Sequence, residues 1–361
     1  MSVIAPARPP AAAPQTKRKL PKTTKSAILL AGLVLTLVSI LVAVAVGSTS
    51  LSVAEVAESV RLAVFGGEVP AGFAKTYTVV IGLRLPRVAL ATVAGAALSL
   101  AGVLMQALLR NPLVSPFTLG VSPAAAFGAA LAILLLSGTG APSFLVALGA
   151  LITALAVSAL VLGLSRTRAA STATLLLLGV AMTQLFEALT SAVQFVADEN
   201  TLQQIVRWTF GSVNEATWSD VGFVAAILAL AIPVAVWNAT KLNAVAFAGD
   251  DSAKSLGVHV DALRVGLITV AVLLASVVVS VCGVIGFVGL VGPHIARLII
   301  GGDHRFLLPF SVVAGGMLLL VADTVGRTIL APAVIPVGIV VAVVGAPLFI
   351  NLIISRRKAI G

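Results

Sequence analysis

Three arginines lie beside long apolar runs, at positions where a guanidinium group could bind an anionic partner. Arg84 and Arg87 are the two arginines of the segment RLPR, and Arg327 ends the segment ADTVGR. The planar guanidinium fork binds a carboxylate through two parallel hydrogen bonds. The same side chain also anchors helix ends at a membrane interface. These arginines are therefore candidates either for docking an acidic partner or for anchoring the chain in a bilayer.

Residues for catalysis or metal binding are not grouped in the sequence. No GxxxxGK[ST] phosphate-binding loop occurs, so the chain cannot hydrolyse ATP by that route. The three histidines, His259, His294 and His304, form no close cluster with one another or with cysteine, which argues against a bound metal ion. The apolar runs also lack the series of carboxylates that a proton- or sodium-coupled carrier needs. We therefore expect no catalytic residue, no metal ion and no cofactor in this chain.

Glu187 is the one acidic residue that lies clearly inside an apolar run. A charged carboxylate at the bilayer centre costs roughly 2.5–3.5 kcal/mol on insertion scales, so it should face protein or water. It could line a translocation path, or it could be a protonated or snorkelling packing residue nearer the outer surface. Gln106 and Asn111, near the end of the run that follows RLPR, are two further path candidates. Hydrogen bonding between helices is an equal alternative for Gln106.

The most informative hydrophilic segment is KLNAVAFAGDDSAKSLGVHVDALR, residues 241–264. It is too long for a tight turn and polar enough to lie outside lipid. Gly249 and Gly257 bracket a short predicted helix, because glycine is common at helix boundaries. Asp250 and Asp251 suit the positive N-terminal end of that helix. A defined helix outside the membrane is what a membrane subunit needs to receive force from a separate motor, and a solvated connector is the alternative.

The composition places the chain in a lipid bilayer. Hydrophobic residues make up 59% of it and charged residues only 10%, whereas soluble domains carry about 25% charged residues. A bilayer core of roughly 30 Å needs about 20 apolar residues per helix. The single cysteine, Cys282, excludes a disulfide framework and is expected to be a small packing residue. The predicted fold class is all-α, a polytopic membrane protein of about ten transmembrane helices.

The ten predicted helices form one membrane domain, residues 27–355, which includes the coupling loop 241–264. They lie at roughly 27–47, 88–109, 118–137, 143–164, 172–196, 220–238, 264–283, 285–300, 307–326 and 336–354. In the second of them, Gly95 and Gly102 permit close approach of a neighbouring helix. A basic, proline-rich tail (1–26), predicted to be disordered, precedes the domain, and a basic C-terminus (356–361) follows it.

The distribution of lysine and arginine predicts the orientation in the membrane. With a cytoplasmic N-terminus, 17 of the 23 basic residues fall in cytoplasmic segments and 6 fall outside, as the positive-inside rule requires. Both termini are then cytoplasmic, and Arg84, Arg87 and Arg327 lie outside. The net charge of +10 follows from this bias rather than from nucleic-acid binding. Two outer segments, 51–65 and 200–218, have interfacial patterns and are either passive caps or partner contacts.

Seven ordered motifs carry a resemblance to a known family. They are RLPR (84–87), the run GAALSLAGVLMQALLRNPLVSPFTLGVSPAAAFGA (95–129), RWTFGS (207–212), AGDDSAKSLGV (248–258), GFVGLVGPHIARLIIGGDHRFLLP (286–309), ADTVGR (322–327) and IPVGIVVAVVGAPLF (335–349). From about residue 50 to 355 the chain resembles the FecCD-type, BtuC-like permeases of binding-protein-dependent ABC importers for ferric siderophores, haem and cobalamin. This resemblance implies the fold of a type II ABC importer permease.

The resemblance also implies partners and site residues. Two permease subunits, identical or similar, would enclose a path across the bacterial cytoplasmic membrane, with two ATP-binding cassette ATPase subunits beneath them. An extracytoplasmic substrate-binding protein would present acidic residues to Arg84, Arg87 and Arg327. Segment 248–258 would be the coupling helix that docks into the ATPase. The residues that carry over to this docking are Asp250, Asp251, Ala253, Leu256 and Gly257.

A ferric siderophore is the expected substrate, with haem and cobalamin as alternatives within the same architecture. Val334 stands where the family commonly has a glutamate, two residues before the proline of PVG, so a polar contact near the outer mouth is missing. An ion-coupled secondary transporter and a membrane-embedded enzyme are the rival classes. The missing acid relay argues against the first, and the missing cluster of His, Asp or Glu argues against the second.

Overall fold

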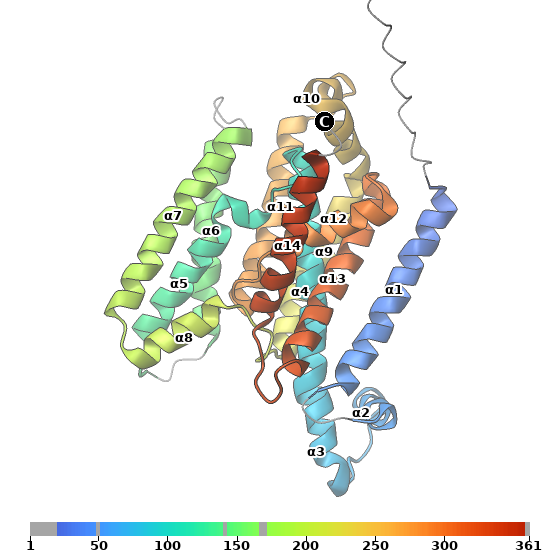
Figure 1. The fold of residues 1–361 in the computed structure, drawn as a ribbon, viewed down its shortest axis with the longest axis vertical. Coiled ribbons are helices and arrows are strands. Elements are labelled where there is room, and N and C mark those ends of the chain that lie inside the picture. Colours follow the sequence, from blue (N-terminus) through green and yellow to red (C-terminus); the bar gives the residue numbers. More distant parts are fainter. Residues whose placement is uncertain (1–19, 48–50, 140–142, 166–171, 358–361) are drawn as a thin grey trace, which may run out of the picture.

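The computed structural model describes residues 20–47, 51–139, 143–165 and 172–357, and this part of the chain folds into helices joined by turns and loops. Seven of the described helices are long and apolar enough to cross a membrane, and three shorter apolar helices accompany them. Together they correspond one for one to the ten predicted membrane segments. The predicted all-α polytopic membrane fold is thereby confirmed (Figure 1).

The bounds of the apolar helices follow the hydrophobic runs of the sequence. They are α1 (Lys22–Ala45), α4 (Leu85–Leu108), α5 (Val121–Leu136), α6 (Phe144–Ser165), α7 (Thr172–Val196), α9 (Trp218–Trp237), α11 (Val260–Cys282), α12 (Val288–Ile300), α13 (His304–Thr328) and α14 (Val337–Arg357). The α-helices outside the ten apolar segments are α2 (Val53–Phe65), α3 (Ala74–Tyr77), α8 (Glu199–Thr209) and α10 (Ala239–Ser255).

The first helix begins earlier than the sequence suggests. Residues 22–26, assigned above to a disordered tail, form the first turns of α1 directly after Pro21. The apolar run that starts at Ala27 extends the helix, and helix growth adds one hydrogen bond for each further residue fixed, so the preceding polar residues join it. The rest of the predicted tail, residues 1–19, lies outside the described residues, as do residues 358–361 of the basic C-terminus.

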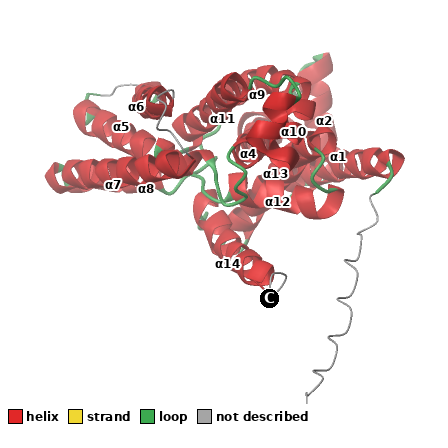
Figure 2. Ribbon diagram, turned by 90° about the horizontal axis from the view of Figure 1, so that it is seen from above, coloured by secondary structure: helices red, strands yellow, loops and turns green. Residues whose placement is uncertain are grey.

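Helix α4 is the centre of the molecule. It continues from α3 through a π-helix, η2 (Thr78–Arg84), so that Ala71–Leu108 forms one rod of 38 residues. Within its most apolar stretch, 83% of the residues are buried. Seen from above, the helices α9, α11, α12 and α13 surround it, while α5 to α8 form a separate group to one side (Figure 2). A helix that is buried on nearly all sides needs neighbouring helices whose backbones can come close to its own.

Glycine and serine on α4 permit this close packing. A Cβ atom added to Gly102 would lie 1.8 Å from the carbonyl oxygen of Gly289 on α12. A Cβ atom added to Gly95 would lie 2.3 Å from the carbonyl oxygen of Gly315 on α13. Ser99, between them on the same face, is fully buried. In lipid, where burial of apolar surface does not drive helices together, such small residues stabilise helix pairs through direct van der Waals contact.

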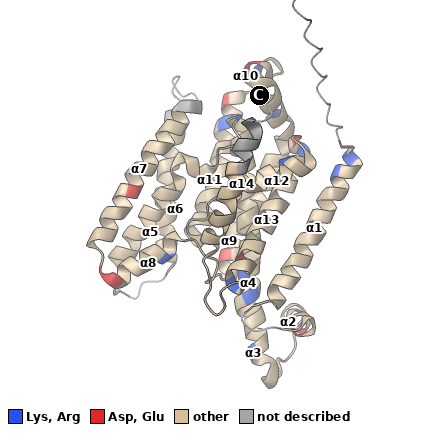
Figure 3. Ribbon diagram, viewed as in Figure 1, with Lys and Arg blue, Asp and Glu red and all other residues tan. Residues whose placement is uncertain are grey.

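Most charged residues lie toward the two ends of the bundle, and α7 carries an acidic residue partway along its length (Figure 3). Helices α2, α3 and α8 lie at one end, whereas α10, the start of α1 and the end of α14 lie at the other (Figure 1). The outer segments and the coupling loop of the sequence interpretation are therefore on opposite ends. At the first end, the Ser52 side chain and Glu55 form a capping box that starts α2.

Candidate functional site

The outer arginine cluster, named for the side on which the loop charges predict it, consists of Arg84 and Arg87 of the α4 rod and Asp323 and Arg327 of α13. Arg87 donates from Nε to both carboxylate oxygens of Asp323 at 3.0 Å, and from Nη2 to Oδ1 at 2.7 Å. The Asp323 side chain is only 1% exposed, and its Oδ2 lies 3.8 Å from Nε of Arg327. One buried carboxylate thus stands between two guanidinium groups.

Two arginines of the cluster, Arg84 and Arg327, also bond to backbone carbonyls at the end of α1. Arg84 donates from Nη1 to the carbonyl oxygens of Val44 and Ala45, at 2.8 and 3.0 Å. Arg327 donates from Nη2 to the carbonyl oxygen of Ala43. The last carbonyl groups of a helix lack intrahelical partners and carry its negative dipole end, so cationic donors stabilise them. The cluster therefore fastens α1 to the α4–α13 pair.

The π-helix η2 determines where Arg84 points. Pro86 has no N–H group, and in a regular helix its ring would collide with the carbonyl four residues earlier. The turn before it is wider, and the N–H of Leu85 donates to Val80, five residues back. The carbonyl of Ile81 then faces Pro86, which cannot donate, and it accepts from Nε1 of Trp218 at 3.0 Å instead. Arg84, at the end of this segment, is buried.

The three arginines predicted to dock a partner lie together at one end of the bundle. Arg84 and Arg327 are 7% and 6% exposed. Docking stays a prediction, and each of the three arginines already binds a carbonyl or carboxylate of this chain. Asp323, which is central to this arrangement, was not among the predicted residues, although it lies four positions before Arg327 on one helix face.

The short helix predicted within the loop 241–264 lies where the sequence placed it; we call residues 239–257 the coupling segment after its predicted role. Helix α10 is broken at Gly249, whose φ is 84°, and the short helix that starts at Asp250 ends at Gly257, whose φ is 80°. Left-handed backbone of this kind costs little for glycine. Asp250 accepts from Nη2 of Arg264 at 2.7 Å, which ties the short helix to α11. Gly249 lies against the guanidinium group of Arg110, at the end of α4.

The predicted coupling residues divide into buried and exposed ones. Ala253 is fully buried and seats the short helix. Asp251 is exposed, and the Leu256 side chain is 72% exposed. Phe247, which the sequence interpretation did not single out, is 68% exposed on the preceding piece of α10. Two large apolar side chains therefore project from a polar segment.

Three residues, Asn243, Asp303 and His304, join the coupling segment to the start of α13, and we call them the inner clamp. Nδ2 of Asn243 donates to Oδ1 of Asp303 at 2.8 Å, and its Oδ1 lies 2.9 Å from the backbone N and 2.8 Å from Nδ1 of His304. Arg305, which forms a salt bridge with Asp303 at 2.7 Å, is the main reason that the pKa of this carboxyl lies well below its usual range. Asp303 therefore remains ionised at any pH near neutral.

Two of the path candidates have structural contacts. Gln106 is 3% exposed. Its Nε2 donates to the carbonyl of Gly289 at 3.4 Å, and its Oε1 accepts from Arg297 at 3.3 Å. Of its two alternatives, bonding between helices is the one that the geometry favours. Oδ1 of Asn111 accepts from the N–H of Leu113 at 3.0 Å, which shapes the turn after α4.

Glu187, the third path candidate, lies on an exposed polar face of α7. Gln184, Glu187, Ser191 and Gln194 follow one another at intervals of three and four residues, which places them on one side of the helix. Gln184, Glu187 and Ser191 are exposed, and Gln194 is partly so. Nε2 of Gln184 lies 3.4 Å from Oε2 of Glu187. We call these four residues the α7 polar face.

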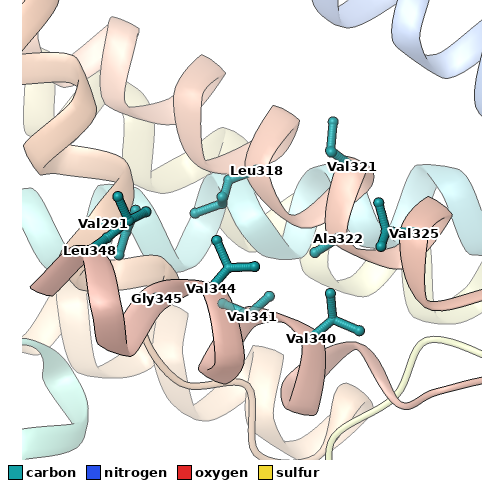
Figure 4. Close-up of a pocket in the computed structure, with 10 residues that line it drawn as sticks. All are labelled: Val291, Leu318, Val321, Ala322, Val325, Val340, Val341, Val344, Gly345 and Leu348. Carbon is teal, nitrogen blue, oxygen red and sulfur yellow. The ribbon is translucent and has the colours of Figure 1, made fainter. Parts of the chain in front are cut away.

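A pocket between α12, α13 and α14 has a wholly apolar lining and offers no group that would orient a polar ligand (Figure 4). Its lining residues are Val291, Leu318, Val321, Ala322, Val325, Val340, Val341, Val344, Gly345 and Leu348. Among the described residues, no group of three or more His, Cys, Asp or Glu side chains could hold a metal ion. Cys282 is buried and unbonded, and it packs within the core.

A bundle of membrane helices with a jointed helix at one end and a charged cluster at the other is the architecture of a transporter's membrane subunit. Residues 35–355 match the FecCD transport family. The chain belongs to this family and is an ABC transporter permease.

Relatives with known names support the same assignment. The hemin transport system permease protein HmuU of Yersinia pestis is 39% identical over 282 residues, which are 77% of this chain and 84% of that protein. The cobalamin import system permease protein BtuC of Halobacterium salinarum is 39% identical over 291 residues, 79% and 76% of the two chains. A solved inward-facing transporter, described as of the metal-chelate type, superposes with a TM-score of 0.79 at 31% identity, covering 91% of this chain and 99% of that one.

Proposed function

We propose that this chain is the membrane-spanning subunit of an ATP-driven importer that carries a ferric siderophore from an extracytoplasmic binding protein to the cytoplasm. The permease itself would carry no catalytic residue, and ATP hydrolysis would occur in two separate ATPase subunits. The similarity to a transporter of the metal-chelate type supports this substrate class. Haem and cobalamin, named for two of the relatives, remain the alternatives.

The observation that carries the proposal is the exposure of Leu256 and Phe247 on the coupling segment. Large apolar side chains in a polar segment outside the apolar spans contribute binding energy when a partner covers them. The joints at Gly249 and Gly257 hold the short helix as a defined unit that a groove can receive. Asp251 and the Asp250–Arg264 pair would orient the helix in that groove, on the cytoplasmic side.

At the outer end, the arginine cluster would steer the binding protein. Three guanidinium groups share a single carboxylate there, so the cluster retains a local excess of positive charge. Excess charge guides an oppositely charged partner into register even without direct contact. Arg87, whose side-chain hydrogen bonds within the described part of the chain all go to Asp323, would be the arginine that rearranges most readily toward an acidic residue of the partner.

The α7 polar face would line the translocation path between this subunit and a second permease subunit. Polar side chains that point into lipid are costly, so this face of α7 should meet water or protein in the membrane. The exposed residues of α6, by contrast, include Leu148, Ile152 and Leu160, which suit lipid. Glu187 would be the charged group of the path.

Uptake measurements test the proposal. Cells that lack the chain, and cells complemented with it, would be given radiolabelled ferric siderophore, haem or cobalamin, with and without an uncoupler. We expect siderophore uptake alone to be lost and restored, and to depend on the ATPase subunits. Restoration of haem or cobalamin uptake instead would contradict the substrate assignment. Uptake that an uncoupler abolishes and that is independent of the ATPase would indicate a secondary transporter.

Two substitutions at one position test the coupling role. Leu256→Asp should abolish uptake because it places a charge in the ATPase contact, while the amount of permease in the membrane stays unchanged. Leu256→Met, which keeps an apolar side chain of similar volume, is the matched control and should retain uptake. Equal uptake by both variants would refute an apolar contact with the ATPase at this residue.

A further inference from the structure

One amide side chain connects the coupling segment to the next long helix. Asn243 lies on the first piece of α10, and Asp303 and His304 are the N-cap and the first residue of α13. The amide donates to the Asp303 carboxylate and accepts from the backbone and ring of His304. In the described part of the chain, every hydrogen bond between α10 and the start of α13 uses Asn243.

Packing around the amide closes the joint. His304 is 3% exposed, and its ring meets the Phe247 ring edge-on, with the centroids 6.4 Å apart. Gly302 leaves room for Phe247, because a Cβ atom there would lie 3.1 Å from its ring. A half-buried amide with both ends bonded holds a single orientation, since leaving either end unpaired would cost desolvation free energy. The exposed Phe247 and the buried turn thus belong to one rigid unit.

Helix α13 extends from this joint to the outer arginine cluster. It starts at His304 and carries Asp323 and Arg327 near its far end. Arg87 and the last carbonyls of α1 are attached there. A continuous helix with a bonded partner at each end transmits a rigid-body shift from one end to the other.

We propose that Asn243 is a positioning residue that makes α13 move together with the coupling segment, so that ATPase binding inside and binding-protein docking outside bias the same helix. This inference rests on the proposed function as an ATP-driven importer. It also assigns a role to the GDHR part of the sequence motif at 302–305: Asp303 and His304 bind the first piece of α10 rather than the substrate.

The reversed pair of Asn243→Asp with Asp303→Asn tests the proposal. In the double variant, the new amide at 303 can donate to the new carboxylate at 243, which still accepts from His304, and Asn also caps helices well. Asn243→Asp alone places two carboxylates face to face, and Asn243→Ala removes all three bonds. Asn238→Ala is the matched control, because that amide bonds only to Val234 and Lys241 near it in sequence.

The first readout is ATP hydrolysis by the permease assembled with its ATPase subunits, with and without its binding protein loaded with ferric siderophore. Asn243→Ala and Asn243→Asp should lower the stimulation by the binding protein about tenfold, measured relative to each variant's own basal hydrolysis and within the roughly 5–150-fold range of allosteric couplings. The double variant should recover the stimulation, and Asn238→Ala should keep it. Normal stimulation in both single variants would overturn the proposal.

The second readout does not depend on transport. Spin labels at Ser252 on α10 and Val321 on α13, both introduced as cysteines, report the distance between the two helices; Cys282 is buried and stays unlabelled. We expect one narrow distance distribution in the parent and the double variant, and a broad one in Asn243→Ala. An unchanged distribution in Asn243→Ala overturns the proposal. If the parent complex shows no stimulation at all, the proposed function fails, and the distances still decide whether Asn243 joins the helices.

Discussion

Helices α4 and α7 have nearly equal lengths, 24 and 25 residues, yet the molecule uses them in opposite ways. In the apolar stretch that contains α4, 83% of the residues are buried, whereas in α7 the fraction is 17%. Hydrophobicity alone does not separate them, because both are apolar enough to cross a membrane. The difference lies in residue size and in the position of the polar groups.

On α4, the residues at the contacts are small, and the side chains of Arg87 and Gln106 bond to neighbouring helices of the same chain. On α7, glutamine, glutamate and serine occupy one outward face and bond only within the helix. The polar groups of α4 therefore serve packing within this chain, whereas we predict that the α7 polar face contacts water or a second subunit.

The substitution with the largest expected loss of stability is Gly102→Val on α4. The added side chain would collide with the backbone of Gly289, which cannot turn aside as a side chain could. We expect a loss well above the roughly 1–3 kcal/mol typical of overpacked cores, and little folded protein in the membrane. Gly163→Val on α6, where no atom lies within 4 Å of the new Cβ, is the control and should fold normally. Folded yield and size-exclusion profiles in detergent measure both.

The next test removes the Asp323 carboxylate of α13, which pairs with Arg87 of α4. Asp323→Ala should lower the free energy of unfolding by about 3–5 kcal/mol, because it leaves buried guanidinium groups without a counter-charge. The double variant Arg87→Met with Asp323→Leu should lose less, since it removes Arg87 together with its counter-charge and leaves only Arg327, which keeps its bond to the carbonyl of Ala43. Arg61→Ala on α2, which breaks an exposed pair with Glu58, is the control and should leave the midpoint of thermal unfolding unchanged. Equal losses in all three would refute a special role of the buried pair.

At Glu187 on α7, a smaller effect is expected, and it concerns the uptake rate rather than stability. Glu187→Gln keeps the shape of the side chain and removes its charge. We predict an unchanged unfolding midpoint and a several-fold change in the uptake rate, because the α7 polar face would serve transport and not folding. If the unfolding midpoint fell as it does for Asp323→Ala, α7 would be a packed helix after all, and the comparison would fail.

The smallest effect is expected at Leu177, which is 71% exposed on α7. Leu177→Ala should change the free energy of unfolding by less than about 0.5 kcal/mol, as substitutions away from packed features usually do, and it should leave uptake intact. The unfolding midpoint in lipid nanodiscs, together with uptake in cells, measures this. A large loss of uptake would extend the partner contact beyond the polar face.

Much of the fold could be predicted from the sequence because each membrane helix coincides with an apolar run that is long enough to indicate it. The coupling helix could be predicted for a similar reason, since Gly249 and Gly257 interrupt the pattern at its ends. The small residues of α4 likewise indicated close packing. All of these signals are local in sequence.

The missed contacts are not local. Arg87 and Asp323 are 236 positions apart, and Asn243 and His304 are 61 apart. No periodicity within either helix says which distant helix will lie against it. The burial of Arg84 and Arg327 could not be predicted for the same reason, because their partners are the carbonyls at the end of α1, which every helix end possesses. Only the folded arrangement shows which end lies within reach.

The π-helix before Arg84 has a consequence for chain length. Its wider turns hold extra chain relative to an α-helix, and each residue of an α-helix corresponds to about 100° of rotation. Deleting one residue between Thr78 and Leu83 would remove the wide turn and rotate the residues before it by about one residue's turn relative to α4. Arg84 would keep its register with α4, whereas α3 would leave its present direction, although no contacting side chain of the cluster had changed. Among relatives, a gap or an insertion just before RLPR therefore marks the chains in which the tip preceding α4 is oriented differently.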